Sequence, residues 1–293
     1  MYGAVKSIRW GYTAGVVGVL AAALCGSSVG ILVRLVEHAD GWQVLFFRSV
    51  SFALTVFLFM MLRDGRRVGK RFLSVGPLGI VVAVFLGSAF IAFIFSVLLT
   101  TVTNAVLILS ASPFFAAIMA RTFLGERVSA LSWGCMIAGL AGVAVMMADG
   151  LLDGTILGSA VALLAALGYS ASIVAYRAGK DIDMMPATCL AGVFAAIVSG
   201  FLVDNFELTR TDFTIAVLLG TVQIGFQYIL ITLAARFVPV AEITLLMLLE
   251  VVAAPIWVWI GVGEVPAYLT LAGGTIVLIA VVVQAVWGSN QNQ

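Results

Sequence analysis

Two stretches of the chain share one pattern of small and apolar residues, LAAALCGSSVGILVR at residues 20–34 and LLAALGYSASIVAYR at residues 163–177. Six aligned positions are identical, among them a central serine and the closing arginine. A second pair follows in the same order, GERVSAL at residues 125–131 and GEVPAYL at residues 263–269. The two pairs together predict an internal repeat.

The composition is that of an integral membrane protein. Hydrophobic residues make up 63% of the 293 residues, charged residues make up 10%, and the mean hydropathy is +1.19. A soluble domain averages about 25% charged residues and could not remove this much apolar surface from water. The first apolar run, from Tyr12 to Val33, is longer than the apolar region of a signal peptide, so we expect it to be retained as a membrane span.

Apolar runs separated by polar connectors predict an all-α membrane protein of ten transmembrane helices. The repeat places five helices in residues 12–148 and five in residues 155–287, followed by a polar tail at residues 288–293. The expected spans are residues 12–34, 43–62, 75–98, 102–121, 130–148, 155–176, 187–204, 213–234, 238–261 and 266–287.

The basic residues indicate the orientation of these spans. With the N-terminus in the cytoplasm, twelve of the fifteen Lys and Arg residues lie in cytoplasmic segments, and only Arg34, Arg48 and Arg210 lie at or near the outer side. This is the positive-inside pattern. An odd number of spans would break it, so we expect both termini to be cytoplasmic. The basic cluster at residues 63–71 is then an anchor on anionic lipid rather than a nucleic-acid site.

The repeat also bears on mechanism. Because each copy has an odd number of spans, the second copy is expected to be inverted in the membrane. Inverted repeats are an architecture of secondary transporters, whose substrate site lies near the bilayer midplane between the repeats. The P-loop sequence GxxxxGK[ST] is absent from the chain, so ATP is not hydrolysed by that route.

Few residues could support catalysis or hold a metal. His38 is the only histidine, and Cys25, Cys135 and Cys189 are dispersed among apolar runs. We therefore expect no metal and no cofactor. An intramembrane hydrolase or acyltransferase needs a serine–histidine pair or a metal site, so the sequence argues against an enzyme. A channel or scaffold has as little support, because neither a selectivity-filter repeat nor a large soluble domain is present.

The chain resembles the EamA-type members of the drug/metabolite transporter superfamily. The resemblance rests on the two five-span repeats, a small-residue first span that ends in Arg34, Arg48 in the second span, and Pro113 ahead of the turn Gly125-Glu126-Arg127. Within the superfamily the chain is most similar to the aromatic amino acid exporters of the YddG type. The resemblance implies a ten-helix exporter of the bacterial inner membrane that alternates between inward-open and outward-open states.

Two positions depart from the pattern of that family. Ala191 stands in the second repeat where an arginine equivalent to Arg48 would be, and Val251 follows Glu250 where the family often has a proline. The two halves are therefore related only approximately.

Glu250 is the main candidate for the transport site. It has seven uncharged residues on each side and falls near the middle of its span, where a carboxylate costs about 2.5–3.5 kcal/mol on insertion scales. Trp257 lies on the same helical face. We expect Glu250 to attract a substrate ammonium or to take a proton, and Trp257 to pack against an apolar side chain. The alternative is a protonated glutamic acid that only bonds another helix.

Two glutamines four residues apart, Gln223 and Gln227, lie on one face of the eighth span. Amides donate and accept hydrogen bonds, so they suit both ends of an amino acid. They could equally join helices to one another. Tyr228 is an adjacent, weaker candidate.

Arg48 and Glu242 are expected near opposite ends of the bundle. Arg48 could pair with a substrate carboxylate, but snorkelling to the outer surface or a gate ion pair is favoured. Glu242 lies near the cytoplasmic end of the ninth span. We interpret both as gate or scaffold residues.

Four weaker candidates complete the predicted cavity wall: Tyr169, Ser88, Phe95 and Asn104. Packing between helices is the alternative for all of them. One acid, amides and aromatics suit a small zwitterion, so the expected substrates are aromatic and other neutral amino acids. Cationic or lipophilic drugs are the alternative. The expected partners are the substrate and the lipid bilayer, with no nucleic acid and no obligatory protein partner.

Overall fold

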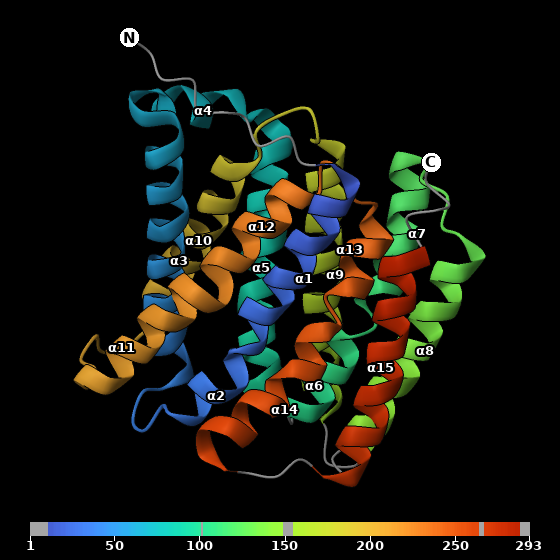
Figure 1. Ribbon diagram of the computed structural model, residues 1–293. Coiled ribbons are helices and arrows are strands. Elements are labelled where there is room, and N and C mark those ends of the chain that lie inside the picture. The colour runs from blue at the N-terminus through green and yellow to red at the C-terminus, as the bar shows by residue number, and fades with distance from the viewer. Residues whose placement is uncertain (1–10, 101, 149–154, 264–266, 288–293) are drawn as a thin grey trace.

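The protein is a bundle of helices that run between two ends (Figure 1). The computed structural model describes residues 11–100, 102–148, 155–263 and 267–287, and these residues contain helices and no strand. The polar tail predicted at residues 288–293 lies outside them. Seven helical segments are long and apolar enough to cross a membrane, and three shorter apolar helices accompany them. The first described helix begins, and the last one ends, at the same end of the bundle (Figure 1).

Six helices follow the predicted spans without interruption. Their ends shift by up to four residues from the predicted limits, because caps rather than hydropathy set them. Asp40, for example, caps the second span in a reciprocal pair with Gln43. These helices are α3 (Gly41–Asp64), α5 (Gly76–Leu99), α8 (Ala130–Met146), α9 (Ile156–Ala178), α10 (Met185–Gly200) and α15 (Tyr268–Trp287).

The other four predicted spans are interrupted. The first span consists of α1 (Tyr12–Ser27) and α2 (Val29–Arg34), and the fourth of α6 (Val102–Leu109) and α7 (Ser112–Leu124). The eighth span consists of α11 (Arg210–Leu218), the π-helix η3 (Leu219–Phe226) and α12 (Gln227–Ala234). The ninth consists of α13 (Val240–Leu246) and α14 (Leu249–Val262). Two short helices, η1 (Gly65–Arg67) and α4 (Val68–Ser74), join α3 to α5.

Proline accounts for only one of these interruptions. Pro113 occupies the first turn of α7, where the missing N–H leaves no helical bond unmade. Pro255, in contrast, lies inside α14. The ninth span is broken earlier, at Met247 and Leu248, so that Glu250 falls in the first turn of α14.

Glycine ends both α7 and α14. Gly125 and Gly263 are the C-caps, with φ of 69° and 80°. This left-handed conformation costs a glycine little, and it satisfies a free carbonyl of the last turn. The repeated Gly-Glu pairs in the sequence therefore mark the ends of two comparable helices. Glu264 itself lies outside the described residues.

The main helix pairs join the first half of the chain to the second. α3 packs on α10, α5 on α9, and α8 on α15. α1 packs on α12 and α14, while α9 packs on α5 and α7. Small residues let the backbones approach in these pairs, as is usual in membranes.

The α8–α15 pair depends on such an approach. A Cβ atom added to Gly142 would lie 2.8 Å from both the carbonyl oxygen of Gly273 and a methyl group of Val277. The two backbones therefore have no room for a side chain at this crossing.

We predict that Gly142→Ala lowers the thermal stability of the protein in detergent, because overpacking costs about 1–3 kcal/mol. Gly134→Ala on the same helix is the matched control, since a Cβ there meets nothing within 4 Å. Equal melting temperatures for the two variants would contradict the close crossing.

Candidate functional site

The carboxylate of Glu250 lies at the contact of three helices. Its Oε2 accepts a hydrogen bond of 2.7 Å from Nε2 of Gln227, at the start of α12. The residue is only partly exposed. Glu250 lies in the first turn of α14, where its backbone N–H donates to the carbonyl of Met247 in the break between α13 and α14.

α1 covers this hydrogen bond through Gly26. A Cβ atom added there would lie 2.1 Å from Nε2 of Gln227 and 2.5 Å from Oε2 of Glu250. A glycine at this position is therefore a condition for the contact, and it is a site residue that the sequence did not single out. Its only signal was its place in the small-residue pattern that opens the repeat.

Trp257 also contacts α1. Its indole Nε1 donates a 2.8 Å hydrogen bond to Oγ of Ser27, and 40% of the residue is exposed. Glu250 and Trp257 thus share one helix and face neighbouring residues of another. Ser27 is the second residue of the site that the sequence analysis did not name as a candidate.

Gln223 and Gln227 have different partners, although the sequence placed them on one helical face. Oε1 of Gln223 accepts a 3.1 Å hydrogen bond from Nη2 of Arg48, whereas Gln227 binds Glu250. The π-helix η3 contains Gln223 and ends just before Gln227. Its i→i+5 pattern removes the α-helical stacking of residues four apart, so the two amides reach different neighbours.

Arg48 lies inside the bundle and does not snorkel. The residue is 8% exposed, and its guanidinium carbon lies 5.7 Å from the centre of the Phe90 ring. Tyr228, Phe52 and Phe90 pack edge to face around this region, with ring centres 5.2–5.8 Å apart. The expectation that Arg48 extends to the outer surface is therefore wrong, because the side chain is buried against Phe90. Its role as a gate or scaffold remains a prediction.

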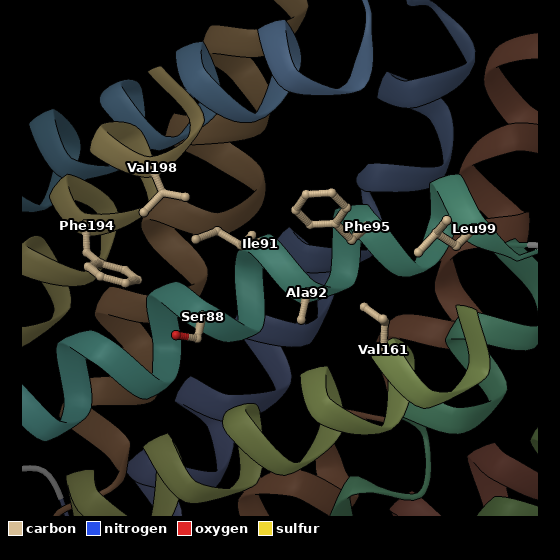
Figure 2. Close-up of a pocket in the computed structure, with 8 residues that line it drawn as sticks. All are labelled: Ser88, Ile91, Ala92, Phe95, Leu99, Val161, Phe194 and Val198. Carbon is tan, nitrogen blue, oxygen red and sulfur yellow. The ribbon is translucent and has the colours of Figure 1, made fainter. Parts of the chain in front are cut away.

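The weaker candidates lie in three different places. Tyr169 on α9 is near enough to interact electrostatically with Glu250. Ser88 and Phe95 instead line a cavity of roughly 400 Å³ between α5, α9 and α10, with Phe194 and Val198 (Figure 2). Asn104 donates hydrogen bonds to Thr100 and to Ser159, which joins α6 to α9. The structure thus puts Ser88 and Phe95 at an apolar pocket that Glu250 does not line.

Ion pairs join the two halves of the chain at the end where α1 begins. Asp183, between α9 and α10, receives Arg63 and Arg71 from the first half and Arg236 from the second. Arg177 donates a 2.7 Å hydrogen bond to Glu126. Among the described residues, the ion pairs between the halves all lie at this end.

Glu126 and Glu242 form further contacts at the same end. Glu126 also accepts from the backbone N–H of Val240, so it stabilises the start of α13 rather than only its own turn. Glu242 is buried and accepts a hydrogen bond from the hydroxyl of Tyr12 at the start of α1. The place of Glu242 agrees with a role in a gate, which remains a prediction.

Known proteins resemble the chain over nearly its whole length. The sequence model of the EamA-like transporter family matches twice, at residues 13–148 and 156–285. The chain belongs to the EamA-like transporter family.

Two curated relatives of this EamA-like transporter are transporters as well. The pseudopaline exporter CntI of Pseudomonas aeruginosa is 21% identical over 272 residues, which are 90% of this chain and 94% of the exporter. The uncharacterized transporter YdfC of Bacillus subtilis is 26% identical over 269 residues, with 89% and 85% of the two chains covered. One crystal structure matches with a TM-score of 0.82 at 15% identity and covers 95% of this chain and 99% of its own, which shows the shared fold.

We predict that Asp183→Asn loosens the end at which the ion pairs lie, because three arginines lose their shared acceptor. The expected loss is about 1–2 kcal/mol, between the values for exposed and for buried ion pairs. Hydrogen–deuterium exchange should become faster in the α9–α10 connector and in α4. Asp181→Asn is the control, since Asp181 is an exposed acid two residues away. Equal exchange in the two variants would contradict a role for the cluster in closure.

Proposed function

We propose that this EamA-family transporter exports small organic solutes across the bacterial inner membrane, with aromatic and other neutral amino acids as the leading substrates. The family and the exporter among its relatives support transport and its direction. The observation that carries the substrate class is the pairing of Glu250 with Gln227 beside Trp257. A carboxylate recognises an ammonium, and an exposed indole offers an apolar face. This chemistry agrees with the YddG-type branch.

The proposed architecture is ten spans in two inverted repeats, residues 12–148 and 155–287. The helix pairs support it. In the two repeats α1 is equivalent to α9, α5 to α12, and α7 to α14. The α1–α12 contact is therefore equivalent to α9–α5, and the α1–α14 contact to α9–α7. The α3–α10 and α8–α15 pairs each join two equivalent helices. The glycine caps of α7 and α14 are also related in this way.

Alternating access is the proposed mechanism. The ion pairs around Asp183 and Glu126 lie at the end rich in Lys and Arg, which the positive-inside pattern assigns to the cytoplasm. The opposite end also has contacts between the halves, where Asp212 accepts from the backbone N–H groups of Glu37 and His38, so opening at either end breaks interactions between the halves. Release of the ion pairs around Asp183 and Glu126 would accompany opening toward the cytoplasm.

A second candidate function is the efflux of organic cations. It is favoured by the same acid and by the indole of Trp257, because aromatic faces attract cations. In this case the substrate would need no carboxylate partner.

We predict that proteoliposomes containing the wild type move labelled Phe, Trp, Thr and Met, and that Glu250→Gln reduces this movement about tenfold or more, since a charge-assisted contact is lost. Glu207→Gln is the control, because Glu207 is an exposed acid outside the site.

The same transport assays are run with one organic cation, with and without a pH gradient. They distinguish amino acid export from cation efflux and test whether Glu250 carries a proton. Transport of the cation alone would replace the amino acid proposal with efflux of cations. Gradient-driven accumulation that survives in Glu250→Gln would exclude Glu250 as the obligatory proton carrier.

A further inference from the structure

Arg48 is a buried cation with few partners. The residue is 8% exposed, its Nη2 donates to the neutral amide of Gln223, and its Nε has no hydrogen-bond partner among the described residues. A buried charge is costly unless it is paired and its donors are satisfied. One amide and the face of Phe90 do not satisfy a guanidinium that has five N–H donors.

Glu250 acts electrostatically on Arg48, but among the described residues the two form no ion pair. Each forms its hydrogen bond with a different glutamine of the eighth span. The charges are therefore arranged as a separated pair, with Gln223 beside the cation and Gln227 beside the anion. A molecule that has its own separated charges of opposite sign complements this arrangement.

We propose that Arg48 binds the carboxylate of a zwitterionic substrate whose ammonium binds Glu250. This inference rests on the proposed function and adds to it the second charged contact. The Nε and Nη2 atoms of arginine form the fork that binds a carboxylate through two parallel hydrogen bonds. Nε is free for this bond, and the amide of Gln223 can yield Nη2 to a charged acceptor.

The surroundings of Arg48 determine which molecules can use it. The guanidinium lies over the ring of Phe90, which packs against Phe52 and Tyr228, and a charged hydrogen bond in such apolar surroundings is stronger than in water. The preferred class is then an α-amino acid, or another small compound in which one carboxylate and one ammonium are close together. A simple amine lacks the group that Arg48 recognises.

The test compares phenylalanine with phenethylamine, which has the same ring and ammonium but no carboxylate. Counterflow of both labelled compounds is measured in proteoliposomes of the wild type, Arg48→Gln, Arg48→Lys and the control Arg66→Gln. Arg66 is exposed on η1, far along the chain from the site residues. Size-exclusion profiles and melting temperatures report on folding, and Arg48→Lys retains the charge if Arg48→Gln does not fold.

We expect Arg48→Gln to reduce phenylalanine counterflow about tenfold or more, as expected for a lost charged hydrogen bond, and to change phenethylamine counterflow less than about threefold. Arg48→Lys should retain part of the phenylalanine counterflow, because the charge remains while the fork is lost. Equal losses for the two compounds would overturn the inference and leave Arg48 a structural counter-ion. A wild type that carries the amine but not the amino acid would overturn the amino acid proposal and this inference together.

Discussion

The burial of one carboxylate in an apolar helix is the constraint on which the arrangement of this transporter depends. Glu250 would be costly at the middle of an unbroken membrane helix. The chain offsets that cost through the contacts of Glu250 on α14: Gln227 on α12 supplies an amide donor, and Gly26 on α1 leaves room for the contact because it has no side chain. Each element belongs to a different span, so the carboxylate holds three helices in register.

Three of the four interrupted spans meet where this contact is made. The first, eighth and ninth spans are interrupted and pack on one another, whereas α5 and α9, which form the counterpart of the α1–α12 pair, are continuous. Irregular backbone in a membrane is tolerated where protein or a cavity can satisfy it. The two halves thus share a packing plan, but the contact of Glu250, Gln227 and Gly26 is made by the first, eighth and ninth spans.

Sequence patterns predicted the class of protein and singled out Glu250 as a candidate, but they did not predict the partners of the polar side chains. Hydropathy indicated the helices, and a lone glutamate in an apolar run identified Glu250. The separate partners of Gln223 and Gln227 depend on a π-helix, which an evenly apolar run does not reveal. The depth of Arg48 depends on Phe90 of another helix, and the direction of Ser88 and Phe95 depends on which face of α5 meets α10. These are tertiary relations that no local pattern contains.

The central claim is that a substrate ammonium binds the carboxylate of Glu250. Infrared difference spectroscopy of the reconstituted protein, recorded before and after addition of phenylalanine, measures this contact directly. The account predicts a shifted protein carboxylate band that is absent in Glu250→Gln and retained in Glu207→Gln. A difference spectrum in Glu250→Gln identical to that of the wild type would contradict it.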